Sequence, residues 1–90
     1  MASSIIAMQQ IKSVEYTGTT NSVGKIEGGL NTFGINDGTM VLRAFFVRGS
    51  FTARRKVDVY DYGNSGLGLE FSDNGSPVNN QSVTAILYYI

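Results

Sequence analysis

Apolar and polar residues alternate along several short segments of this chain, and glycine-bearing turns separate those segments. Between residues 67 and 72, leucine or phenylalanine stands at every second position, with glycine, glutamate and serine in between. Successive side chains of a β-strand point to opposite faces, so a period of two residues places one face in a core and the other in water. The pattern therefore predicts a half-buried strand at 67–72.

Three further segments have a strong strand signal. Residues 39–47 and 53–62 are rich in valine, phenylalanine and tyrosine, and residues 82–90 are apolar on both faces. A strand that is apolar on both faces belongs in the middle of a sheet or against a neighbour. Residues 62–66 contain two glycines and an asparagine, which predicts a hairpin between 53–62 and the strand at 67–72.

The first third of the chain has a less regular pattern. Residues 11–17 are rich in β-formers, and residues 25–35 fit one or two glycine-broken strands before a turn at Asn36-Asp37-Gly38. Residues 1–10 fit either an extended N-terminal arm or a short helix capped by a serine.

These segments predict an all-β fold with residues 1–90 as a single domain. We expect five to seven mostly antiparallel strands in a small sandwich or a partly open barrel. Residues 72–81 are expected to be a loop of ordinary length.

A tight turn at Gly49-Ser50 would join 39–47 and 53–62 as a hairpin. It would place Leu42 opposite Val57 and Met40 opposite Val59, which gives one apolar face. The predicted core then consists of Met40, Leu42, Ala44, Phe46, Val57, Val59, Leu67, Leu69 and Phe71. Val41, Arg43, Phe45 and Val47 are expected on the opposite face.

The chain has no cysteine and no histidine. A Ser-His-Asp triad, a Cys-His dyad, a zinc site and a dithiol site are therefore excluded. No phosphate-binding glycine loop is present, and we expect neither catalysis nor a cofactor. Four carboxylates raise the possibility of calcium, but turn and surface roles explain them better, so no metal is expected. These carboxylates are Asp58, Asp61, Glu70 and Asp73.

The charges are segregated although the net charge is zero. Arg43, Arg48, Arg54, Arg55 and Lys56 lie within fourteen positions, and no basic residue follows them. The predicted hairpin places Arg43 opposite Lys56, so this segment requires an anionic counterpart.

Three counterparts for the basic segment stay open. Asp58 or Glu70 of the same subunit would neutralise it internally, or the acidic end of a neighbouring copy would do so. The third is nucleic acid or a sulfated glycan. Nucleic acid is disfavoured because the modules that bind it are usually clearly basic.

Apolar residues exceed what one core face can bury. A small chain without disulfides gains stability by burying such surface against a partner. The predicted interface consists of Val41, Arg43, Phe45, Val47, Arg54, Arg55, Ile86 and Tyr88. We therefore expect a homo-oligomer, either alone or within a larger protein assembly.

The predicted function is structural: a homo-oligomeric β building block, such as a decoration, tail or fibre component of a virus particle. The glycine-, serine-, threonine- and asparagine-rich composition without cysteine is one that small phage virion proteins often show, although no motif identifies a family. The alternative is a small lectin-like module, with a site formed by Tyr60, Tyr62, Asn64, Asp73 and Asn74. The absence of tryptophan weakens this alternative.

Membrane insertion and export are not expected. The apolar runs are far shorter than the ~20 residues that span a bilayer, and the first ten residues carry no lysine or arginine. We therefore expect synthesis in the cytoplasm, with the final location open.

Overall fold

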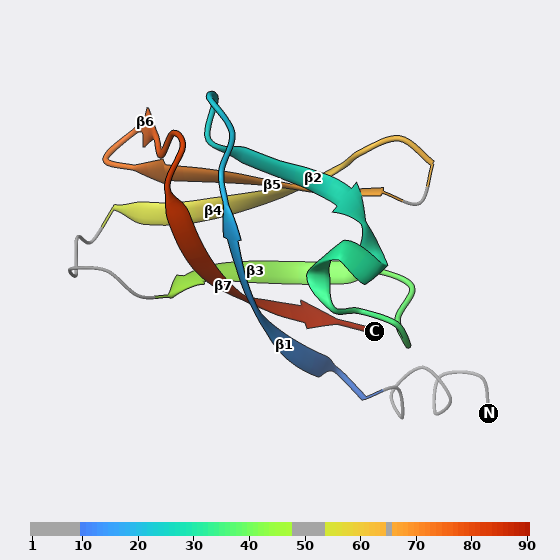
Figure 1. Cartoon of the computed structure of the whole chain (residues 1–90). Helices are drawn as coiled ribbons and strands as arrows, with labels where there is room; N and C mark the ends of the chain where they lie inside the picture. The colour runs from blue at the N-terminus through green and yellow to red at the C-terminus, as the bar shows by residue number, and fades with distance from the viewer. Residues whose placement is uncertain (1–9, 48–53, 65) are drawn as a thin grey trace.

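The computed structural model describes residues 10–47, 54–64 and 66–90, which form two antiparallel sheets (Figure 1). The elements are β1 (Lys12–Thr19), β2 (Lys25–Gly29), η1 (Leu30–Phe33), β3 (Val41–Val47), β4 (Arg55–Asp61), β5 (Gly66–Asp73), β6 (Ser76–Pro77) and β7 (Ser82–Tyr89). Sheet A has the strand order β1-β7-β3. Sheet B has the order β2-β5-β4, with β6 also paired to β5. The predicted all-β sandwich of five to seven strands is confirmed.

β7 occupies the middle of sheet A, as its two apolar faces predict. It pairs antiparallel with β1 on one edge and with β3 on the other. Val83, Ala85, Leu87 and Tyr89 of β7 are buried in the core. Of the residues between them, Thr84 is buried, Ile86 is half-buried and Tyr88 is exposed.

The core lies between the two sheets and has one contribution from outside them. Leu69 and Phe71 of β5 are fully buried against Leu87 of sheet A. Phe33 of η1 is also buried, and its ring meets Tyr16 of β1 edge to face at a centroid distance of 4.9 Å. η1 follows β2 directly, so this contact links sheet B to sheet A.

The segment 25–35, expected as one or two strands, is one strand followed by a turn of 3-10 helix. Gly34 ends η1 in the left-handed conformation with φ 81°. Glycine adopts this conformation without steric cost, and its amide donates to the carbonyl of Asn31 at 3.1 Å.

The predicted pairing of residues 39–47 with 53–62 is wrong. β3 pairs with β7 and β4 pairs with β5, so the two strands belong to different sheets. Val57 lies opposite Phe71 and Val59 opposite Leu69. The fully buried inner face of β5 offers these valines better apolar partners than residues 40 and 42 would. The predicted turn at Gly49-Ser50 itself lies outside the described residues.

The predicted face of the first half of β3 is also wrong. Met40 and Leu42 are exposed, and Val41 packs against the core instead. The register with β7 shifts here, because Val41 pairs with Tyr89 and Arg43 pairs with Tyr88. Leu42 is the extra residue of a bulge, and one extra residue reverses the face of everything before it. Ala44 and Phe46, which follow the bulge, face the core as predicted.

The turns around β5 are regular hairpins. Tyr62 donates its amide to the carbonyl of Gly66 at 3.2 Å, which confirms the hairpin predicted at 62–66, although residue 65 is outside the described part. Asn74 and Gly75 have φ of 52° and 82°, the pattern of a two-residue turn, and lead into β6. The expected loop at 72–81 therefore contains a short strand. Residues 1–9, with the predicted arm or helix, lie outside the described residues.

Candidate functional site

The outer face of sheet B is polar, and its side chains bind one another. Lys25 lies 3.9 Å from Glu70, and Lys56 lies 3.7 Å from Asp58. The Tyr60 ring lies across Gly68, where a Cβ would overlap it, and its hydroxyl donates to Glu27 at 2.5 Å. Burial, followed by the hydrogen bond to Glu27, raises the pKa of Tyr60.

The outer face of sheet A is apolar at its centre. Phe45 of β3 lies beside Ile86 of β7, and Arg43 lies beside Tyr88. The Phe45 and Tyr88 rings meet edge to face at 5.7 Å, although Phe45 is 49% exposed and Tyr88 is 37% exposed. The Arg43 guanidinium lies 6.0 Å from the centre of the Phe45 ring. We call Arg43, Phe45, Val47, Ile86 and Tyr88 the sheet A patch.

The sheet A patch contains five of the eight residues predicted to form an interface. Val41 is on the core side of β3 because of the bulge. Arg54 directly precedes β4 and Arg55 begins it, in the other sheet. The predicted β3–β4 pairing is absent, but Arg55 still lines a hollow of about 330 Å³ together with Arg43 and Phe45.

The described part of the basic segment lies on strands of two different sheets, although Arg43, Arg55 and Lys56 line one shallow hollow of about 330 Å³ between β3 and β4. Arg55 lies opposite Asp73 in the β4–β5 ladder, with Nε 3.1 Å from Oδ2, and its guanidinium lies 5.1 Å from the centre of the Phe46 ring. Lys56 pairs with Asp58. Neutralisation within one subunit therefore holds for these two side chains. Arg43 makes no ion pair within the described part of the chain.

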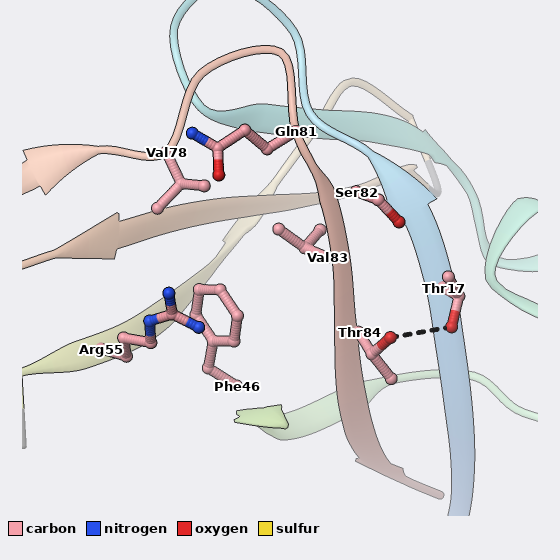
Figure 2. A pocket seen from close by; sticks show the side chains of 8 residues that line it. All are labelled: Thr17, Phe46, Arg55, Val78, Gln81, Ser82, Val83 and Thr84. Carbon is pink, nitrogen blue, oxygen red and sulfur yellow. Dashed lines mark hydrogen bonds between the residues drawn. The ribbon is translucent and has the colours of Figure 1, made fainter. Parts of the chain in front are cut away.

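A cleft of about 440 Å³ opens at the end of the sandwich where β7 begins (Figure 2). The hydroxyls of Thr17 and Thr84 share a hydrogen bond of 2.9 Å at its edge. Gln81 and Ser82 add hydrogen-bonding groups, and the described lining contains no carboxylate. Only Arg55 of this lining was predicted as a site residue, since residues 17, 46 and 81–84 converge only through the sheet packing.

A second cleft, of about 390 Å³, lies around the turn between β4 and β5. Asn64 lines it together with Thr39 and Asp61. Tyr62, in the same turn, is 47% exposed.

The residues predicted for the alternative glycan site are separated. Asp73 and Asn74 lie at the far end of the β4–β5 ladder, beside Arg55, whereas Tyr62 and Asn64 are in the turn. The two strand ends of a hairpin lie opposite its turn, so these two pairs cannot converge. Tyr60 lies on the outer face of sheet B.

No three acidic residues gather into a possible metal site among residues 10–47, 54–64 and 66–90. Asp58 and Asp73 are in ion pairs with basic residues of the same sheet. In the same part of the chain, no helix is long and apolar enough to cross a membrane.

No protein-family model, curated protein or solved structure matches the chain. The surfaces described above are therefore the basis on which a function is proposed.

Proposed function

We propose that the protein is a structural building block that assembles with copies of itself through the outer face of sheet A. The observation that carries this proposal is the aromatic and aliphatic centre of the sheet A patch, Phe45, Ile86 and Tyr88. Contiguous exposed apolar side chains usually mark an association surface. The outer face of sheet B, by contrast, consists of paired charges and polar groups.

The occupant that we propose for this face is a second copy. Glu15 of β1 and Phe45 of β3 lie on the two sides of Ile86, and Arg43 lies two residues along β3, beside Tyr88. A second copy, turned about an axis along β7, sets β1 of one copy over β3 of the other. Glu15 then comes over Phe45 of the second copy, one outward-facing position from Arg43, and by symmetry the reverse contact forms as well. Opposite charges at the rim fix the orientation, and the apolar centre supplies most of the affinity.

A place in a virus particle, as a decoration, tail or fibre component, is the setting that we propose for this assembly. Its support is the neutral, cysteine-free and glycine-rich composition. A net charge of zero offers little electrostatic resistance to packing many copies together.

Sedimentation velocity at micromolar concentration tests the proposal. The wild type should sediment as an oligomer, and Phe45→Ser should sediment as a smaller species because it removes the ring at the centre of the patch. Tyr62→Ser is the matched control, since Tyr62 is equally exposed but lies in the β4–β5 turn. It should assemble like the wild type.

A monomeric wild type would contradict this proposal. The cleft lined by Thr39, Asp61 and Asn64 then favours the second candidate, a glycan-binding module, because it combines hydrogen-bonding groups with apolar Met40 and Leu30. Binding of the monomer to immobilised glycans, lost in Asn64→Ala, would establish that function instead.

A further inference from the structure

We propose that the free edge of β1 pairs antiparallel with β1 of a second copy, so that sheet A continues across two subunits. This inference rests on the proposed self-assembly and adds an interface separate from the sheet A patch. It concerns backbone groups at the edge of the sheet rather than side chains on its face.

The edge strands of the two sheets differ in how they are protected against pairing. β3 carries the bulge at Leu42, and β2 has only five residues, of which the last two are glycines. β4 carries Arg55, Lys56, Asp58 and Asp61 along its length. Bulges, short strands and charges are the devices that keep edges from pairing.

β1 lacks these devices. It has eight residues, no proline, and an unbroken register with β7 from Lys12 to Thr19. Glu15 is the only charge in its interior. A long, regular edge of this kind is a template for another strand.

The hydrogen-bond alternation shows which groups of β1 point outward. Thr20 continues the register of β1, and its amide donates to the carbonyl of Gln81 at 2.9 Å. Bonded and non-bonded pairs alternate in an antiparallel ladder, so the even-numbered residues of β1 bond β7. The odd-numbered residues of β7 then bond β1, and its even-numbered residues bond β3. Ile90 fits this alternation, because its amide donates to the carbonyl of Met40, next to β3.

The odd-numbered residues of β1 therefore direct their amides and carbonyls to the free edge. Ser13, Glu15, Thr17 and Thr19 are the residues concerned, and all four are exposed. Within the described chain, β1 has no strand partner other than β7.

The residues of β1 also favour one register of self-pairing. In an antiparallel pair of β1 strands related by a twofold axis perpendicular to the sheet, the axis lies midway between each two paired positions. Paired residues share a face, so both are odd-numbered or both are even-numbered, and the midpoint falls level with a residue. An axis at Glu15 would set two glutamates opposite one another, which is unfavourable. An axis at Tyr16 instead sets Glu15 opposite Thr17 of the second copy and Ser13 opposite Thr19. These are the residues whose backbone groups point outward, so the edges bond each other in this register.

This pairing would enlarge the surface used by the proposed assembly. A twofold axis perpendicular to the sheet leaves the outer faces of both copies on the same side. The sheet A patches of the two subunits would then belong to one continuous surface.

Amide hydrogen exchange of the wild type, followed by NMR at an assembling concentration, tests the edge directly. The even-numbered amides of β1 should be protected in any folded state. The amides of Ser13, Glu15, Thr17 and Thr19 should also be protected, and should lose that protection on dilution to the monomer. Fast exchange of these four amides in an oligomer would overturn the edge pairing while leaving the patch interface standing. A wild type that is monomeric at all concentrations would overturn both.

Thr17→Pro provides a second test. Proline is tolerated on an edge strand where its missing N–H would face solvent, so the monomer should fold, but the donor for the second copy is lost. Thr17→Val is the matched control, because it also removes the hydroxyl that bonds Thr84 and keeps the amide. Thr17→Pro should lower the oligomer mass and Thr17→Val should not. An unchanged mass for folded Thr17→Pro would overturn the proposal, and if this variant does not fold, the exchange measurement on the wild type decides.

Discussion

Asp37 ties the loop between η1 and β3 to both β1 and β7. Its Oδ1 accepts a hydrogen bond of 2.8 Å from the hydroxyl of Tyr89, and its Oδ2 lies 3.1 Å from Nζ of Lys12. Gly38 follows directly, and a Cβ there would come within 2.5 Å of the Tyr89 ring. The Tyr89 hydroxyl, followed by Lys12, lowers the pKa of the Asp37 carboxyl. Asp37 was predicted only as a turn residue, since nothing local in the sequence places residues 12 and 89 beside it.

Asp37→Asn should change how stability depends on pH. A carboxyl whose pKa is lower in the folded state stabilises the fold above its unfolded pKa of about 3.9, and this contribution is lost as the pH falls through the folded pKa. The variant should therefore be less stable than the wild type at neutral pH, and the difference should shrink on acidification. Urea unfolding at neutral and acidic pH measures it.

Tyr89→Phe, which removes the first partner of Asp37, should shift the pH dependence in the same direction. If the free energy of unfolding of the wild type and of Asp37→Asn changed with pH in parallel, the contacts of the Asp37 carboxylate with Tyr89 and Lys12 would not contribute to stability.

The bulge in β3 decides which side chains of that strand are available to the proposed assembly. Leu42 and Arg43 both point outward, and the alternation then continues with Ala44 inward and Phe45 outward. Without the extra residue, Val41 would join the outer face and Leu42 would enter the core. A local irregularity of one residue therefore controls the composition of an entire face.

Leu69→Ala and Leu42→Ala form a matched pair that tests this assignment. Leu69 is fully buried in β5, so its truncation should lower the free energy of unfolding by about 2–5 kcal/mol through lost burial and a cavity. Leu42 is 44% exposed, so the same change should cost less than about 0.5 kcal/mol in the monomer. Chemical denaturation at low protein concentration compares them. A large loss of unfolding free energy in Leu42→Ala would mean that Leu42 is buried in the core, which would contradict the bulge.

The whole molecule is a sandwich whose two outer faces have different chemistry. Sheet B presents paired charges, and sheet A presents the sheet A patch beside the edge of β1, which among residues 10–47, 54–64 and 66–90 has no strand partner other than β7. Both features of sheet A favour the binding of a second copy, and a domain of this size buries only a small core of its own. We therefore expect part of its stability to come from association.

The melting temperature should accordingly rise with protein concentration, because a partner that binds only the native state stabilises it by mass action. Each kcal/mol gained in this way shifts the midpoint by about 4–8 °C in a domain of this size. Calorimetry over a concentration series measures the rise, and Phe45→Ser should reduce it while Tyr62→Ser should not. A midpoint that is independent of concentration in the wild type would argue for a self-sufficient monomer.

The sequence by itself determined the strands, because a period of two residues is a local property of the chain. It placed β4, β5 and β7 within two residues of their ends, predicted β7 for the middle of a sheet, and predicted the β4–β5 hairpin from its glycines. Phe45, Ile86 and Tyr88 were also assigned to a common surface from alternation alone.

Only the tertiary structure decided which strands pair. β4 pairs with β5 and β3 pairs with β7, so the described basic residues lie on strands of two different sheets. Neither the bulge at Leu42 nor the contact of Asp37 with residues 12 and 89 has a local signal. Pairing and register minimise the free energy of the whole core, and residues far apart in the chain contribute to it together.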